Sequence, residues 1–327
     1  MHAAPDLVAA DQLSGAAASV LYIIINPGSG AADAQEKRDL LARVFEEEGR
    51  AHRFVPVASP KELEAATDRA AVEATATQGI LVAVGGDGTI NTVAATAVRH
   101  GCAIGVLPQG TFNLFGRSHG ISQDLETAAR ALARGRPEPV QVAEANGRLF
   151  LVNASLGLYP QLLQDRESFK KQFGRHRWVA ILSGLVTLFE WRRQLTVELE
   201  SNGQRVVLTT PTLFVGNNPL QLERIGIDPA VAKQVGSGQL AAIVAKPIGT
   251  VAMLVLLLRG AFGTLGDADQ IRSFAFRSLE VKVRRMRRLK IATDGEVGVA
   301  TPPVVFSVSA KPLMLVVPRA EDRVPVE

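Results

Sequence analysis

Cysteine is nearly absent from this sequence of 327 residues. The single cysteine, Cys102, excludes an intramolecular disulfide and cannot build a cysteine-rich metal site, so we expect a small buried hydrophobic residue there. The five histidines, at positions 2, 52, 100, 119 and 176, lack the spacing of metal ligands. We therefore interpret the histidines as structural or solvated.

Long hydrophobic runs are also missing. The longest, Val251–Leu258, is about half of the roughly 18–20 residues that a membrane span needs. Residues 1–18 lack the basic start and apolar stretch of a signal peptide, and their composition predicts a disordered tail. We therefore expect a cytoplasmic protein that does not span a bilayer. Peripheral contact with the inner membrane face stays open.

The remaining composition is that of an ordinary soluble globular protein, with 47% hydrophobic and 21% charged residues. The formal net charge of +4 identifies no partner, and the oligomeric state is not readable from the sequence. At roughly 100–200 residues per domain, the length suggests two domains.

The first part of the chain alternates apolar strands with helices. We expect strands near 20–25, 52–57, 79–84 and 103–107, and helices near 34–48, 61–75, 90–100 and 124–133. Ser59 is a plausible cap for the second of these helices. Strand–helix alternation predicts an α/β domain with a parallel sheet covered on both faces.

The pattern changes after residue 137 to a run of strands, which predicts an all-β antiparallel sandwich. We expect these strands near 139–145, 148–155, 195–200, 204–210, 212–216, 239–245, 278–285 and 304–309. Helices would interrupt them near 172–191 and 250–262. The predicted organisation is a tail at 1–18, an α/β domain at 19–137 with a return at 312–320, and a sandwich at 138–311.

The strongest motif lies between a buried strand and a helix, in Ile80-Leu81-Val82-Ala83-Val84-Gly85-Gly86-Asp87-Gly88-Thr89-Ile90-Asn91. Glycines let the backbone approach phosphates closely, and free amides at a helix N-terminus attract anions. Asp87 would hold Mg²⁺ against the phosphates, directly or through water. The alternative is an Asp-Gly turn with a capping Thr89, and no Gly-Lys-Ser/Thr follows to make a Walker loop. The length of the pattern favours a phosphate-binding loop.

Two more glycine-containing loops follow other strands of the same predicted sheet. They are Asn26-Pro27-Gly28-Ser29-Gly30 and Leu107-Pro108-Gln109-Gly110-Thr111-Phe112-Asn113. Each loop alone is as consistent with an ordinary turn. Since ligands of open α/β sheets collect outside the carboxyl ends of the strands, the three loops together predict a phosphate-binding cleft.

An acidic segment, Asp294-Gly295-Glu296, follows a basic stretch late in the chain. By itself this segment favours a hairpin turn. It could instead supply carboxylates, because phosphoryl transfer uses Mg²⁺ across the phosphates and often a carboxylate that takes the acceptor's proton. Asp87, Asp294 and Glu296 would meet that need if the two domains fold together.

The four motifs together, in order and spacing, resemble the diacylglycerol kinase catalytic-domain family, which includes bacterial diacylglycerol kinases, sphingosine kinases and ceramide kinases. The resemblance covers about residues 20–317 and implies an N-terminal nucleotide-binding domain, also similar to that of NAD kinases, and a C-terminal β-sandwich. It implies ATP contacts from Asn26, Pro27, Gly28, Ser29, Gly30, Gly85, Gly86, Asp87, Gly88, Thr89, Asn91, Gly110, Thr111 and Asn113. By the same resemblance, Asp294 would accept the proton, with Glu296 and Asp87 assisting through Mg²⁺.

Two departures from the family pattern remove carboxylates. Bacterial members often have an aspartate after the Asn of the third motif, where this chain has Leu114. They also often carry an Asp-Gly-x-Leu-Asp segment that helps hold a structural Mg²⁺, and the corresponding stretch here runs from Ser237 to Ala241. We therefore do not expect that structural metal.

Basic residues near position 285 could attract anionic headgroups or could form a solvated strand face; they are Lys282, Arg284, Arg285, Arg287, Arg288 and Lys290. The apolar 178–191 segment, flanked by arginines, resembles an interfacial helix, although core packing is slightly favoured. No nucleic-acid-binding module is recognisable.

The resulting hypothesis is an ATP- and Mg²⁺-dependent lipid kinase. It would transfer the γ-phosphoryl group to a hydroxyl of a diacylglycerol-like, phosphatidylglycerol-like or sphingoid-base lipid. One alternative is an NAD kinase-like small-molecule kinase, because NAD kinases and phosphofructokinases also use a Gly-Gly-Asp-Gly loop. The other is a non-catalytic protein that binds nucleotide and lipid.

Overall fold

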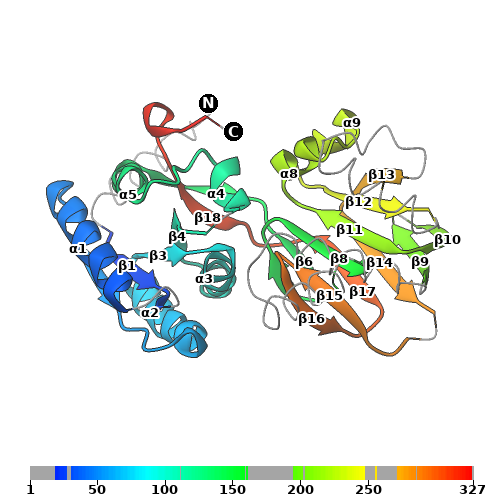
Figure 1. The fold of residues 1–327 in the computed structure, drawn as a ribbon, viewed down its shortest axis with the longest axis horizontal. Coiled ribbons are helices and arrows are strands. Elements are labelled where there is room, and N and C mark those ends of the chain that lie inside the picture. The colour runs from blue at the N-terminus through cyan, green and yellow to red at the C-terminus, as the bar shows by residue number, and fades with distance from the viewer. Residues whose placement is uncertain are drawn as a thin grey trace, which may run out of the picture. The chain divides into compact units, whose positions relative to one another are not determined.

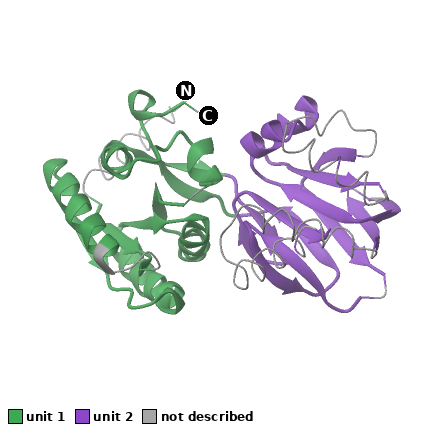
Figure 2. Ribbon diagram, in the orientation of Figure 1, with its two compact units in different colours: residues 1–140, 311–327 green, residues 141–310 purple. Residues whose placement is uncertain are grey.

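The computed structural model describes residues 19–27, 31–110, 112–158, 160, 194–201, 203–246, 255, 271–284 and 286–325. The chain divides into two compact units (Figure 2), unit 1 with Met1–Val140 and Lys311–Glu327, and unit 2 with Gln141–Ala310. The sequence placed the boundary at 137/138 and the return at 312–320. The predicted tail at 1–18 lies outside the described residues.

Unit 1 is built on a six-stranded sheet in the order β2-β1-β3-β4-β18-β5 (Figure 1). Its strands are β1 (Leu21–Ile25), β2 (His52–Val55), β3 (Ile80–Gly85), β4 (Ala103–Pro108), β5 (Arg136–Val140) and β18 (Leu313–Val317). All neighbours are parallel except β5, which runs antiparallel to β18. Every residue of β1 is buried, as expected for a strand of a sheet that is covered on both faces.

Helices cover both faces of this sheet, and α1 contacts α5 while α2 contacts α3. The helices are α1 (Ala31–Glu47), α2 (Leu63–Thr77), α3 (Asp87–His100), α4 (Leu114–Ser118) and α5 (Leu125–Arg134), with 3-10 turns at Pro60–Glu62 and Ala320–Asp322. The chain steps from β1 to β2 in one direction and from β2 to β3 in the other. Right-handed crossovers therefore put α1 and α2 on opposite faces.

Unit 2 consists of two six-stranded antiparallel sheets, β10-β9-β14-β17-β6-β7 and β13-β12-β11-β8-β15-β16. The first contains β6 (Ala143–Ala145), β7 (Arg148–Phe150), β9 (Leu195–Ser201), β10 (Gln204–Thr210), β14 (Ser278–Val283) and β17 (Val304–Val308). The second contains β8 (Asn153–Gly157), β11 (Thr212–Gly216), β12 (Leu240–Ala245), β13 (Ile271–Phe276), β15 (Leu289–Thr293) and β16 (Glu296–Ala300), with short helices α8 (Pro219–Arg224) and α9 (Pro229–Ala232). One hydrophobic cluster draws residues from both sheets, such as Phe306 and Phe276, so the sheets form a sandwich.

The predicted fold class, a parallel α/β domain followed by an antiparallel β-sandwich, is confirmed. Cys102 is buried at 5% exposure, as expected. Among the described residues, no helix combines the length and apolarity needed to cross a membrane. The helices expected at 172–191 and 250–262 lie outside the described residues, apart from Val255.

Two predicted strands were wrong because each one spans a break. The expected strand at 139–145 divides into β5 and β6, which belong to different units, since the chain passes from unit 1 to unit 2 at Gln141. The expected strand at 148–155 divides into β7 and β8, which lie in different sheets. The break at Leu151 and Val152 allows their amides to bond to a side chain far along the sequence.

The expected cap at Ser59 is correct in position only, because Ser59 is the N-cap residue of the 3-10 turn Pro60–Glu62 that precedes α2. Ser59 makes no side-chain cap hydrogen bond, because its Oγ donates to Glu62 Oε1 at 3.2 Å instead. Patterning also missed α4, α8, α9, β13, β15 and β16. The three helices are too short to display helical periodicity, and β16 is largely exposed.

Candidate active site

The three polar loops of unit 1 start level with one another on adjacent strands. Across the β1–β3 pair Ile25 lies opposite Val84, and across the β3–β4 pair Gly85 lies opposite Pro108. Backbone bonds continue this alignment beyond the strands: Asn26 N donates to Val84 O at 3.3 Å, and Gln109 N donates to Gly85 O at 2.8 Å. The parallel sheet therefore brings together the starts of all three loops.

Side chains then join the loops. Asn26 Nδ2 donates to Thr89 Oγ1 at 2.9 Å, which connects the first loop to the first turn of α3. Thr89 is buried at 4% exposure, and the helix begins at Asp87 with Gly86 as its N-cap residue, so Thr89 is not the cap. The alternative interpretation of Thr89 as a helix cap was wrong. Its hydroxyl instead accepts the hydrogen bond from Asn26 that joins the first loop to the start of α3.

Gly86 and Gly110 bring the second and third loops into backbone contact. A Cβ added to Gly110 would lie 3.0 Å from Gly86 Cα and 2.7 Å from Asn113 Oδ1. A side chain at position 110 would therefore push the loops apart. Gly110 is therefore needed for this close approach, whereas a Cβ on Gly86 would lie 3.5 Å from Gly110 Cα, an ordinary contact. A backbone without side chains is also the geometry that can contact phosphate oxygens.

Asp87 is the acidic group at this junction. Its half-buried carboxylate accepts from Asn113 N through Oδ2 at 3.3 Å. Burial raises the pKa of the Asp87 carboxyl, and hydrogen bonds from the backbone of Asn113 and of Asp87 itself oppose that rise only in part. The charged form of Asp87 is therefore poorly stabilised by the protein alone, which is the state expected of a carboxylate that binds a cation.

Asn113 fixes the third loop from within. It is buried, adopts a left-handed conformation with φ 47°, and precedes α4. Its Oδ1 accepts from Gly110 N at 2.9 Å, and its Nδ2 donates to Gly110 O at 2.8 Å and to Gln123 Oε1. The predicted Asn113 therefore shapes the loop, and Gln123 is a partner that sequence patterning missed.

Four of the predicted nucleotide contacts lie outside the described residues: Gly28, Ser29, Gly30 and Thr111. Pro27 follows Asn26 and is half-buried, Gly88 lies in the first turn of α3, and Asn91 is half-buried in the next turn. Their roles stay predictions.

In unit 2, Asp294 and Gly295 form the two-residue turn of the β15–β16 hairpin. Their φ angles of 49° and 85° are those of a type I′ turn, and Thr293 pairs with Glu296 across it. The hairpin that the sequence favoured at this position is present. The same geometry projects the Asp294 carboxylate toward the segment between β7 and β8.

Three consecutive backbone amides bind that carboxylate. Leu151 N donates to Oδ2 at 2.7 Å, while Val152 N and Asn153 N donate to Oδ1 at 2.8 and 2.9 Å. Asp294 N in turn donates to Asn153 O at 2.9 Å. Such a row of N–H groups is a binding site for an anion, and it stabilises the negative charge of Asp294.

Glu296 lies beyond the turn with its side chain 60% exposed, and its Oε2 is 3.1 Å from Arg148 Nη2. An exposed pair of this kind holds the side chain loosely. Asp294 and Glu296 are thus close along one hairpin, while Asp87 belongs to unit 1. The convergence of the three carboxylates stays a prediction.

The side chains present fit one of the two metal ions that the family resemblance raises, and do not fit the other. Asp87, half-buried and beside amide-rich loops, is suited to a Mg²⁺ that accompanies nucleotide phosphates. The structural metal of the family does not fit, because Ser237 is exposed and Ala241 is fully buried in an apolar cluster with Leu222 and Ile243. Within the described part of the chain, no group of three or more Asp, Glu, His or Cys side chains could hold a metal ion.

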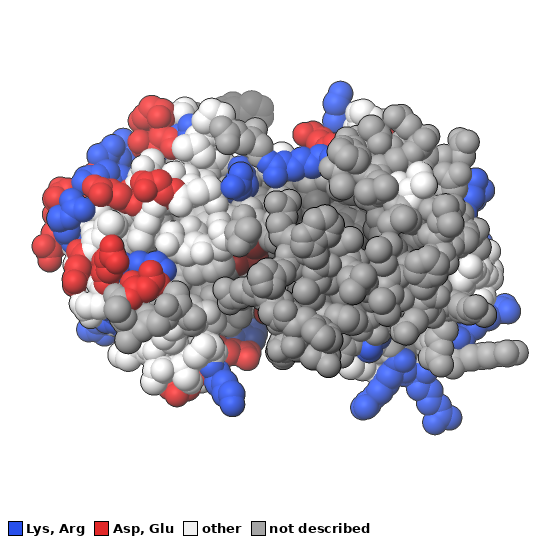
Figure 3. All heavy atoms as spheres, in the orientation of Figure 1, with Lys and Arg blue, Asp and Glu red and all other residues white. Residues whose placement is uncertain are grey.

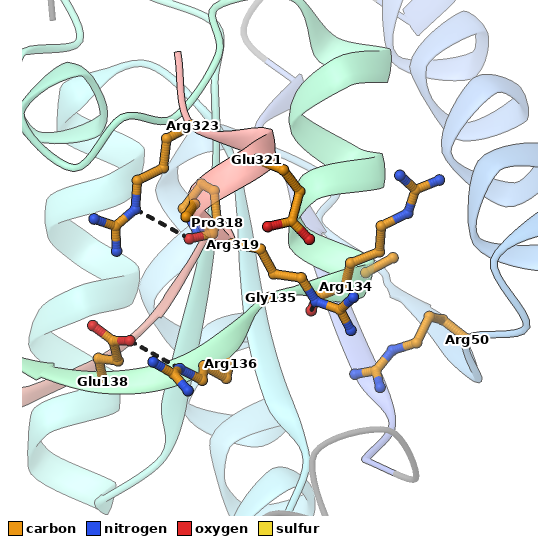
Figure 4. A pocket seen from close by; sticks show the side chains of 11 residues that line it. Arg50, Arg134, Gly135, Arg136, Glu138, Pro318, Arg319, Glu321 and Arg323 are labelled. Carbon is orange, nitrogen blue, oxygen red and sulfur yellow. Dashed lines mark hydrogen bonds and ion pairs between the residues drawn. The ribbon is translucent and has the colours of Figure 1, made fainter. Parts of the chain in front are cut away.

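A basic cavity of about 520 Å³ in unit 1 shares no residue with the three loops (Figure 4). Its arginines are Arg50, Arg134, Arg136, Arg319 and Arg323. Several of their guanidinium groups already bind protein atoms: Arg136 Nε lies 3.0 Å from Glu138 Oε1, and Arg323 Nε donates to Pro318 O at 3.2 Å. Because some of its guanidinium groups already bond to protein oxygens, this cavity is a weaker candidate site than the junction of the loops.

Comparison with known proteins identifies the same part of unit 1. Residues 20–145 match the family described as the diacylglycerol kinase catalytic domain. A protein named "Probable lipid kinase YegS-like" from Klebsiella pneumoniae (strain 342) is 36% identical over 121 residues, covering 36% of this chain and 36% of that protein. Diacylglycerol kinase of Bacillus subtilis (strain 168) is 28% identical over 232 residues, covering 67% of this chain and 71% of that protein.

The fold extends further than these sequence matches. A crystal structure of a diacylglycerol kinase from Bacillus anthracis str. Sterne superposes with a TM-score of 0.65 at 18% identity, covering 92% of this chain and 97% of that one. The alignments to two YegS-like relatives, by contrast, span 36% and 27% of those proteins. Residues 20–145 thus match the diacylglycerol kinase catalytic domain family, and the resemblance drawn from the motifs is confirmed by this match and by the similar proteins.

Proposed function

We propose that this protein is a lipid kinase that transfers the γ-phosphoryl group of ATP to a hydroxyl of a membrane lipid. The observation that carries the proposal is the junction of the three loops of Asn26, Asp87 and Gly110, which are joined by hydrogen bonds and by backbone contact. The match of residues 20–145 to a kinase family supports it. The names of the relatives, lipid kinase and diacylglycerol kinase, support a lipid acceptor.

The glycine loops would bind the phosphates of ATP. The first amides of an α-helix have no partner among the helix carbonyls, and those of α3 directly follow its N-cap residue Gly86. Asn26 and Thr89 hold the neighbouring loop in place. Ser29 and Thr111 would add contacts, as the family resemblance implies.

Asp87 would hold Mg²⁺. The ion, when bound with ATP, supplies positive charge to the phosphate oxygens during transfer. Since burial raises the pKa of Asp87, a cation beside it would stabilise the charged carboxylate that the fold alone stabilises poorly. Glu296 is the second carboxylate assigned to the metal.

Asp294 would accept the proton of the lipid hydroxyl. That oxygen would form its bond to the γ-phosphorus as the bond to the bridging oxygen of ADP breaks, and the released proton would pass to the carboxylate. The three backbone amides that bind this carboxylate would keep it in a fixed orientation during the transfer.

Features of unit 2 favour a lipid over NAD as the acceptor. An apolar cavity of about 370 Å³ is lined by residues that include Leu199, Leu208 and Phe274, with Arg272 at its wall. An acyl chain would lose water-exposed surface there, and NAD carries no such chain. Figure 3 shows Lys and Arg side chains projecting from unit 2, and exposed Arg287 and Arg288 would attract anionic headgroups at a membrane surface.

The protein would act in the cytoplasm, where ATP is available, and would meet its lipid at the inner membrane face. Lys282 of the basic segment is less suited to headgroups, because its Nζ is 2.9 Å from Glu280 Oε1. The solvated-face interpretation therefore fits Lys282 better than it fits Arg287.

The test is a transfer assay on purified protein with labelled ATP and Mg²⁺, offering a lipid extract in one arm and NAD in the other. We expect label in a lipid, which mass spectrometry would identify, and none in NAD. Transfer to NAD alone would replace the proposal with a small-molecule kinase. Binding of ATP without transfer to any acceptor would indicate a non-catalytic nucleotide-binding protein.

A further inference from the structure

The side chain of Gln141 connects separate parts of unit 2. Its Oε1 accepts from Gly238 N at 2.7 Å, and its Nε2 donates to Gln239 O at 2.9 Å. The same Nε2 donates to Asn217 Oδ1 at 2.7 Å. Gln141 therefore binds both backbone groups exposed by the turn that precedes β12.

Asn217 extends this connection to the segment between β7 and β8. It is 5% exposed, and its Nδ2 donates to Leu151 O at 2.8 Å while its own N donates to Val152 O at 2.8 Å. Leu151 and Val152 use their N–H groups on the Asp294 carboxylate. Asn217 thus holds the carbonyls of the segment whose amides hold Asp294.

These bonds occupy the region where the family resemblance places a structural metal. Gln239 O, a carbonyl that could bind a cation, instead accepts an N–H from Gln141. An amide N–H donor directed at that oxygen repels a cation. The carboxylates that would attract one are replaced by the exposed Ser237 and by Ala241, which is 0% exposed.

We propose that Gln141 and Asn217 form an amide clamp that joins the Gly238–Gln239 turn to the Leu151–Asn153 segment without a metal ion. We further infer that both are positioning residues for Asp294, a point that rests on the proposed kinase function. The clamp works because a primary amide supplies donor and acceptor together, so neutral hydrogen bonds satisfy the backbone groups of the turn.

The first experiment measures thermal unfolding of the full chain without nucleotide, in excess EDTA and in millimolar Mg²⁺. A bound structural ion would stabilise the folded state by linkage and raise the Tm as Mg²⁺ is added. We expect the same Tm in both solutions. A saturable rise in Tm with Mg²⁺ that persists in Asp87→Asn would overturn the metal-free clamp.

The second experiment replaces Gln141 of the clamp with methionine, an apolar side chain of similar length, and measures the exchange rates of backbone amide hydrogens. We expect faster exchange of the amides at Leu151–Asn153 and at Gly238. Gln234→Met is the matched control, because Gln234 is exposed and its amide donates only to Ala230 O in α9's own turn. If Gln141→Met exchanges like wild type, the clamp does not exist. Should it fail to fold, Gln141→Glu keeps the acceptor for Gly238 N and removes both donations.

The third experiment separates positioning from folding. In folded Gln141→Met or Gln141→Glu we expect kcat to fall about tenfold while KM for ATP is unchanged, since the ATP loops belong to unit 1. An unchanged kcat with altered exchange would overturn the positioning role and leave the clamp. If wild-type protein transfers no phosphate, the proposed function fails, and the melting and exchange experiments still decide the clamp.

Discussion

The two Asp-Gly pairs of this chain, Asp87-Gly88 in unit 1 and Asp294-Gly295 in unit 2, share a dipeptide and little else. Asp87 opens a helix after a buried strand, and its carboxylate receives a hydrogen bond of 3.3 Å from Asn113 N. Asp294 begins a hairpin turn, and its carboxylate receives bonds of 2.7–2.9 Å from three successive amides. The carboxylate of Asp87 has few donors from the protein, whereas the carboxylate of Asp294 is held by the backbone of its own unit.

The difference in hydrogen bonding gives the two aspartates different effects on the stability of the fold. Burial without sufficient donors raises the pKa of the Asp87 carboxyl, so its charged form lowers the stability of the folded state unless a cation, as we propose, binds beside it. Asp294 gains charge stabilisation and a fixed orientation from the same bonds that hold the segment between β7 and β8. Removing the charge should therefore affect the stability of the two units in opposite directions.

The largest expected effect is that of Asp87→Asn. We expect phosphate transfer to be abolished, because the neutral amide no longer attracts Mg²⁺, while the Tm stays equal or rises. The control is Asp124→Asn, since Asp124 caps α5 by accepting from Thr127 N and asparagine caps equally well. Wild-type turnover in Asp87→Asn would remove that residue from the mechanism.

The pH dependence of stability tests the same site. A raised folded-state pKa means that the folded protein binds the proton more tightly, so ionisation of Asp87 costs stability above that pKa. The stability advantage of Asp87→Asn should be greatest at neutral pH and should vanish below the unfolded value of about 3.9. Urea unfolding at a series of pH values measures it. An advantage that grows toward acid pH would contradict the assignment.

Asp294→Asn should reduce transfer by about a hundredfold to ten-thousandfold, the usual range for a general base. Unlike Asp87→Asn, it should also destabilise the fold by about 1–3 kcal/mol, because one amide oxygen cannot serve all three backbone donors. Turnover numbers and urea unfolding curves measure the two effects. A variant that stays fully active would limit Asp294 to a structural role.

Gly110→Ala tests the close approach of the loops. Its Cβ would lie 3.0 Å from Gly86 Cα, so the loops must separate. We expect KM for ATP to rise about tenfold, the equivalent of about 1.4 kcal/mol of lost binding. The control is Gly147→Asn, at an open turn position with φ 78° that asparagine tolerates. An unchanged KM would show that the two loops do not act together on the nucleotide.

The smallest effect should come from Glu48→Gln, far from either Asp-Gly pair in sequence. Hydrogen bonding and charge from Arg134 lower the pKa of Glu48, so its stabilisation is present above the unfolded pKa of about 4.3 and is lost as pH falls through the lower folded value. We expect a loss of at most about 1 kcal/mol at neutral pH. Glu64→Gln is the control, since Glu64 is 69% exposed and 3.7 Å from Arg99. Equal unfolding free energies for the two variants would contradict the role of Arg134.

Patterning predicted the regular parts of the fold because those parts depend on local sequence. The apolar runs at β1, β3 and β4 fit only buried strands, and the glycine loops after them follow from where parallel strands end. Patterning failed where the chain changes sheets inside an apolar stretch, as at Leu151. A residue between two strands looks like either strand when hydrophobicity alone is read.

The residues of the site also divide into those that the sequence predicted and those that it missed. Asp87, Gly86, Gly110 and Asn113 were readable because each lies within a short motif. Gln141, Asn217 and Arg148 were not, since each acts through a partner far along the chain, as Gln141 does on Gly238. Gln123 was missed because it lies outside the motif of its partner Asn113, ten residues before it. The only local hint was the polar pair Asn217-Asn218 directly after the apolar strand β11.

By itself the sequence determined which segments are strands, which loops carry glycines, and which acids stand beside them, because local sterics and side-chain periodicity set those features. The number of hydrogen-bond donors around each aspartate depends on the tertiary structure alone. That structure leaves Asp87 short of donors and gives Asp294 three, because hydrogen bonds to a carboxylate come from whichever backbone the fold brings within about 3 Å, and the sequence around an Asp-Gly pair does not specify that backbone.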